Sequence, residues 1–67
     1  MTEINISPRQ REILELMGKH DMTPHQVADK LCLSYGTVRG HLLKARKSSG
    51  WATTYGLIWA LAQEDAK

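Results

Sequence analysis

The chain has 67 residues, enough for one small domain with a thin core, because a domain of this size buries only about 60% of its unfolded surface. Its 42% hydrophobic content argues against a disordered tail, and its single cysteine, Cys32, excludes an internal disulfide. The net charge is only +2, but residues 34–50 contain four basic residues and no acidic one, a local patch that suits a polyanion.

The first predicted helix spans about residues 8–18 and follows an extended lead-in over residues 1–6. Ser7 is a suitable N-cap, a proline follows at the first helical position, and Gln10 completes a capping box. Gly18 is the expected end of this helix. Its core-facing residues are Ile13, Leu14 and Met17.

A second helix is predicted over residues 24–31 by the same device, with Thr23 as the N-cap, a proline next, and Gln26 at the third position. Ser34 is then the N-cap of a third helix over residues 35–47. Only residues 32 and 33 separate the second helix from Ser34, and two capped helices joined by such a short turn form a helix-turn-helix.

The third predicted helix has an apolar side and a basic side. Val38, Leu42 and Ala45 recur at spacings of four and three, so they share the side that faces the core. The basic residues lie away from this side without acidic partners. We interpret this helix as a recognition helix that enters the major groove of double-stranded DNA. The alternative is an ordinary solvated helix face that happens to be basic.

A fourth helix is predicted over residues 54–63, with Thr53 or Thr54 as its N-cap. One apolar stripe, which faces the core, contains Leu57, Ile58 and Leu61. A second apolar stripe is more than one small core requires, so we predict a homodimer interface formed by Tyr55, Trp59 and Ala62. The alternative is that the two aromatic residues cap the intramolecular core. The sequence thus predicts an all-α fold of four helices and a single domain over residues 1–67.

Three segments resemble a known family: residues 6–14, residues 25–31, and residues 34–42 with their Thr-Val-x-x-His-Leu core. Together they make the chain similar to the DNA-binding domain of the LuxR/GerE family of bacterial transcription regulators, and to its stand-alone, GerE-like members. The resemblance implies a four-helix domain whose third helix enters the major groove and whose fourth mediates dimerisation. Two serines stand at positions 48 and 49, where this family has a basic residue and a leucine, which predicts a weakened end of the recognition helix.

Residues 34–38, together with residues 44–47, are also similar to region 4 of bacterial sigma factors. We rank this resemblance second, because region 4 normally ends near its basic helix and the predicted structure here continues through Trp59. Under this alternative the chain is a protein-interaction adaptor, or a sigma-region-4-like module, that binds RNA polymerase through Tyr55 and Trp59.

DNA affinity comes mainly from phosphate neutralisation, whereas sequence choice comes from base edges. Arg39 lies in the middle of the basic side and can present two N–H groups to guanine O6 and N7; phosphate contact alone is the alternative. The full set of predicted DNA-binding residues is Thr23, Tyr35, Gly36, Thr37, Arg39, Gly40, Leu43, Lys44, Arg46 and Lys47.

Gly36 and Gly40 lie one turn apart on the third helix. Glycine inside a helix costs roughly 0.5–1 kcal/mol relative to alanine, so a pair of them calls for a reason. Bare backbone here lets the helix approach the base edges closely, with Leu43 or Tyr35 meeting thymine methyl groups. The alternative is that both glycines are merely tolerated.

No arrangement of residues indicates catalysis, so we expect no enzyme activity and no cofactor. The histidines and the cysteine, at positions 20, 25, 41 and 32, have no recognised zinc spacing, so no metal is expected. No apolar run approaches the roughly 20 residues that span a bilayer, and Met1 begins no signal peptide. We expect a cytoplasmic, nucleoid-associated protein of bacterial or phage type, with no membrane partner.

Overall fold

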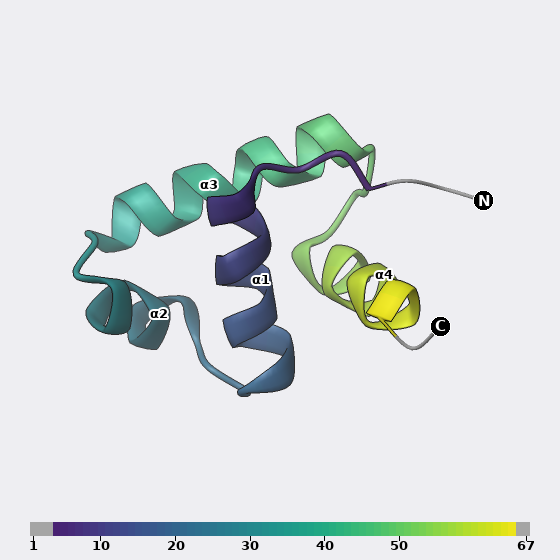
Figure 1. The fold of residues 1–67 in the computed structure, drawn as a ribbon. Helices are drawn as coiled ribbons and strands as arrows, with labels where there is room; N and C mark the ends of the chain where they lie inside the picture. Colours follow the sequence, from purple (N-terminus) through teal and green to yellow (C-terminus); the bar gives the residue numbers. More distant parts are fainter. Residues whose placement is uncertain (1–3, 66–67) are drawn as a thin grey trace.

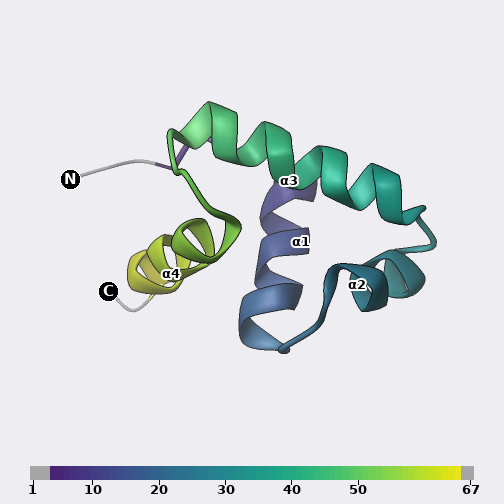
Figure 2. The same ribbon diagram turned by 180° about the vertical axis from the view of Figure 1, so that it is seen from behind.

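The structure is a computed structural model that describes residues 4–65; residues 1–3, the first half of the predicted lead-in, and residues 66–67 lie outside the description. The described residues form four α-helices and no strand, which confirms the predicted all-α helix-turn-helix class. The helices are α1 (Pro8–Lys19), α2 (Pro24–Leu31), α3 (Tyr35–Ser49) and α4 (Thr54–Asp65). The longest helix, α3, lies along one edge of the molecule, and the other three helices lie on the same side of it (Figures 1 and 2).

The starts of α1 and α2 are fixed by the predicted capping boxes. Ser7 Oγ accepts from the N–H of Gln10 at 3.2 Å, while Gln10 Oε1 accepts from the N–H of Ser7 at 3.0 Å. Thr23 and Gln26 make the same pair of bonds, at 3.2 and 2.9 Å. Each box satisfies two backbone N–H groups that would otherwise lack a partner. The position of α2 along the chain is therefore set locally, and so is the start of the helix-turn-helix.

The end of α3 differs from the predicted end at residue 47. The helix runs to Ser49, whose hydroxyl donates to the carbonyl of Ala45 at 2.8 Å. Gly50 then ends the helix in the left-handed conformation, at a φ of 83°, and its N–H donates to the carbonyl of Arg46 at 2.9 Å. The helix therefore includes both serines and ends two residues later than predicted.

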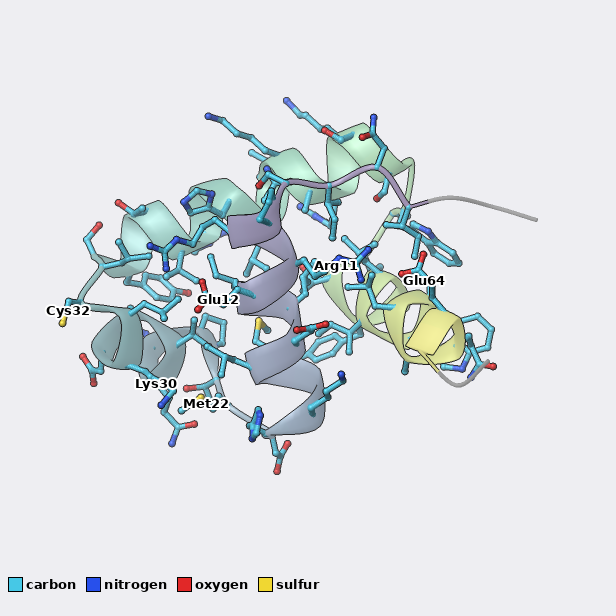
Figure 3. All side chains as sticks on the ribbon, in the orientation of Figure 1. Arg11, Glu12, Met22, Lys30, Cys32 and Glu64 are labelled. Atoms are coloured by element: carbon cyan, nitrogen blue, oxygen red, sulfur yellow. The ribbon has the colours of Figure 1, made fainter. Side chains whose placement is uncertain are left out.

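The core lies where the four helices meet, and α1 contacts all three of the others. The predicted inward stripes are confirmed, with Leu31 and Ile58 only partly buried. The buried cluster contains Ile13, Leu14, Met17, Val27, Ala28, Val38, Leu42, Ala45, Leu57 and Leu61. An ion pair between Arg11 and Glu64, at 3.1 Å, adds a polar link between α1 and α4 (Figure 3).

Gly18 does not end α1, as the sequence suggested, but lets α4 approach it. A Cβ atom at Gly18 would lie 2.6 Å from Cγ2 of Ile58. This methyl is bonded to the β carbon, so it moves away only if the whole side chain or α4 moves. The glycine is therefore required by packing between two helices that are distant in sequence.

We expect Gly18→Ala to lower the free energy of unfolding by about 1–3 kcal/mol, the usual range for overpacking, although alanine is the better helix former. Denaturant unfolding measures the change. Gly40→Ala is the matched control, because a Cβ there meets no atom within 4 Å. An unfolding midpoint of Gly18→Ala at or above that of the wild type would contradict the close contact.

Candidate nucleic-acid interface

The side of α3 that faces away from the core is open to solvent. Val38, Leu42 and Ala45 hold the opposite side of the helix in the core. The exposed residues on this helix include Tyr35, Gly36, Thr37, Arg39, Leu43, Lys44 and Lys47. Arg39 and Lys47 are both exposed, and residues 34–50 contain no acidic residue, so this side of the helix is a cationic ridge. The helix itself lies along the outer edge of the fold (Figure 1). A convex helix of this charge has the shape and sign that a duplex groove accepts.

A shallow groove of about 360 Å³ lies beside this ridge and extends from the first turn of α3 to the start of α4. It is lined by Gly36, Arg39, Gly40, Leu42, Leu43, Arg46 and Thr54. A Cβ at Gly36 would meet only Ser34 Oγ, at 4.0 Å, and one at Gly40 would meet nothing. Contacts within the described residues therefore do not explain these glycines, in contrast to Gly18.

We expect Gly40→Ala to stabilise the domain by about 0.5–1 kcal/mol, the difference between alanine and glycine in a helix interior. If the backbone of α3 approaches base edges at this position, the same change lowers affinity for the preferred DNA sequence. Thermal unfolding and DNA titration of one sample measure both effects. Raised stability with unchanged affinity would show that the glycine is merely tolerated.

Arg46 was predicted to hold a phosphate, but the structure also gives it an internal partner. Its Nη1 donates to the carbonyl of Ala52 at 2.9 Å, and its Nε is buried without a hydrogen-bond partner among the described residues. The guanidinium thus joins the end of α3 to the loop before α4. The sequence carries no signal for this bond, since a backbone carbonyl accepts regardless of residue type.

The two predicted threonines lie at helix N-termini and are both exposed. Thr23 Oγ1 is the N-cap acceptor of α2. The hydroxyls of Thr37 and Ser34 lie 2.8 Å apart, and Ser34 Oγ also accepts from the N–H of Thr37 at 3.1 Å. The hydroxyls of Thr23 and Thr37 therefore already make hydrogen bonds at the starts of their own helices. Both lie beside backbone N–H groups that favour anions.

One residue near the interface was missed by the sequence analysis. The imidazole of His25, on α2, is stacked on the ring of Tyr35, on α3, with ring centroids 3.9 Å apart and an interplanar angle of 7°. The guanidinium carbon of Arg39 lies over the same Tyr35 ring, 5.9 Å from its centroid. The stack therefore connects the first helix of the helix-turn-helix to the predicted base-reading arginine.

The second apolar stripe of α4 is not part of the core. Tyr55 is 78% exposed and Trp59 is 60% exposed, and Ala62 is also exposed. The aromatic residues therefore do not cap the intramolecular core. An apolar groove of about 120 Å³ adjoins Trp59 and Ala62 between α1 and α4; it is lined by Leu14, Glu15, Gly18, Lys19, Ile58, Trp59, Leu61 and Ala62.

Among residues 4–65, no group of three or more histidine, cysteine, aspartate and glutamate side chains is placed to hold a metal ion. Within the same part of the chain, none of the helices has the length and apolar character needed to cross a bilayer.

Comparison with protein families gives a match to sigma-70, region 4, over residues 5–48. Comparisons with curated proteins and with solved structures gave no match. The matched family is the one that the sequence analysis ranked second, and the match ends before α4. Region 4 is a helix-turn-helix module that contacts promoter DNA and RNA polymerase. Because the match covers about two thirds of the chain and includes both helices of the helix-turn-helix, the chain belongs to the sigma-70 region 4 family of DNA-binding modules.

Proposed function

We propose that this protein is a sequence-specific transcription regulator that inserts α3 into the major groove of double-stranded DNA and acts as a homodimer through α4. The observation that carries the proposal is the basic side of α3: residues 34–50 contain four basic residues and no acidic one, and Arg39, Lys44 and Lys47 are exposed. In four-helix organisation the protein then resembles the LuxR/GerE regulators, although its helix-turn-helix belongs to the sigma family.

In this proposal the basic residues of α3 have two roles, base reading and phosphate contact. Arg39 donates two N–H groups to a guanine, the commonest specific contact in the major groove. Lys44 and Lys47 neutralise phosphates and thereby supply most of the affinity, which makes binding strongly salt-dependent. Arg46 reaches a phosphate only with the part of its guanidinium that the Ala52 carbonyl leaves free.

A dimer is proposed because one recognition helix buries little surface, whereas a two-fold pair reads two half-sites about 10 base pairs apart. The exposed aromatic residues of α4 and the apolar groove beside them support this interface. An isologous contact would use the same patch on both copies.

Selection of bound duplexes from a random pool tests the proposal. We expect enrichment of a palindrome with two half-sites about 10 base pairs apart, and affinity that falls steeply as salt rises. Enrichment of a single half-site would support DNA reading but contradict the dimer. If no sequence is enriched, the proposed function is wrong.

The dimer interface has its own test. We expect Trp59→Ala to shift sedimentation at micromolar concentration from dimer towards monomer, because truncating a central aromatic residue at an interface typically costs more than about 1–2 kcal/mol. Lys30→Ala, an exposed residue on α2, is the control and should leave the dimer intact. A wild-type protein that sediments as a strict monomer would rule out this interface.

The family match favours a second candidate function, in which the chain binds RNA polymerase. Here Tyr55 and Trp59 contact the polymerase instead of a second copy. Copurification with the polymerase core that Trp59→Ala abolishes would support this alternative. Its salt response separates it from DNA binding, since an apolar contact does not weaken steeply as salt rises.

A further inference from the structure

The stack of His25 on Tyr35 is formed by two residues at the starts of capped helices. His25 is the second residue of α2 and Tyr35 is the first residue of α3. The capping bonds of Thr23 with Gln26, and of Ser34 with Thr37, fix the backbone on both sides. The nearly parallel rings, 3.9 Å apart, therefore hold each other in place across the two helices.

Arg39 lies one turn further along α3, on the exposed side of the helix. Its guanidinium carbon is 5.9 Å from the Tyr35 centroid, within the range of about 6 Å over which an aromatic face attracts a cation. A free arginine on a helix surface has many rotamers, and binding a base removes that freedom. A contact that already favours one orientation reduces this loss.

We propose that His25 is a specificity-determining residue, although it lies on the helix that does not enter the groove. It fixes the ring of Tyr35, and the ring holds the guanidinium of Arg39 in the orientation that donates to guanine. His25 acts through the other two side chains, so it is a positioning residue and needs no contact with DNA. This inference rests on the proposed base reading by Arg39.

The measurement is competition binding between duplexes that differ at one base pair, the one whose preference is lost in Arg39→Ala. We expect His25→Ala to reduce the preference for guanine at this base pair about two- to five-fold, the size of an exposed cation–π contact. Preference at the other base pairs should stay unchanged. His25→Phe retains a ring that can stack on Tyr35, so it should restore the preference.

His20→Ala is the matched control, since His20 is an exposed histidine in the loop after α1. It should leave discrimination at every base pair unchanged. Thermal unfolding of each variant shows whether it is folded at the temperature of the assay. If His25→Ala fails to fold, His25→Gln decides the question, because glutamine keeps a polar side chain but has no ring to stack on Tyr35, so it should lose the same guanine preference while His25→Phe keeps it.

A second readout uses the free protein and does not depend on DNA binding. The order parameter of the Arg39 Nε–H bond, measured by NMR relaxation, should fall in His25→Ala and recover in His25→Phe. An unchanged order parameter, unchanged guanine preference, or an equal loss at all base pairs would each overturn the inference. A wild-type protein that binds no duplex overturns the proposed function instead, and the NMR result then still decides whether His25 holds Arg39.

Discussion

Leu57→Ala is expected to lower the free energy of unfolding by about 2–5 kcal/mol, the range measured for large-to-small changes in protein cores. Leu57 is 0% exposed and lies among side chains from the other helices. A domain of this size rarely has more than about 3–5 kcal/mol of core stabilisation to lose. The variant should therefore be largely unfolded at room temperature, with lost helical circular dichroism.

Trp59→Ala is the control on the same helix, two residues further on. Its side chain is 60% exposed, so its truncation should cost the monomer clearly less free energy of unfolding than Leu57→Ala does. If Leu57→Ala melts like the wild type, α4 is not part of the folded core. The comparison matters because α4 lies outside the segment that matches the sigma family.

Arg39→Ala is expected to lose about 1–3 kcal/mol of discrimination at one base pair of each half-site, the contribution of a good bidentate contact. Arg39 is exposed, so its removal should not change the folded state. Binding titrations against the selected duplex and its single-base variants measure the discrimination directly. The expected pattern is a loss confined to one position.

Lys44→Ala is the matched control for charge, because it removes one positive charge from another exposed position of the same helix. Its affinity should fall by a similar factor for all sequences, and the salt slope should decrease by about one. If Arg39→Ala behaves in the same way, Arg39 contacts phosphate alone. The two variants therefore separate base reading from charge neutralisation.

The sequence predicted well those features that depend on neighbours along the chain. The capping boxes at Ser7 and Thr23 involve residues three positions apart, so the pattern of residue types contains all of the partners. The inward stripe of α3 follows in the same way from helical periodicity. These local signals fixed the helix starts and most of the core.

Features that depend on distant partners were beyond the sequence. From the sequence alone, Gly18 predicts the end of a helix. Only the structure shows that Ile58 lies against it. The bond from Arg46 to Ala52 needs the path of a loop, and the stack of His25 on Tyr35 needs the crossing of two helices. In each case the pairing is set by tertiary packing, which residue types alone do not specify.

The locally encoded helix starts have a consequence for the rate of folding. Nucleation is the unfavourable step in forming a helix. Each capping box stabilises the first helical turn before any contact with a distant part of the chain has formed. Helical domains rich in such short-range contacts fold within microseconds to milliseconds. We therefore infer that a molecule which unfolds by fluctuation regains its native state quickly, so that its cleavage by proteases follows the equilibrium population of the unfolded state and not the unfolding rate.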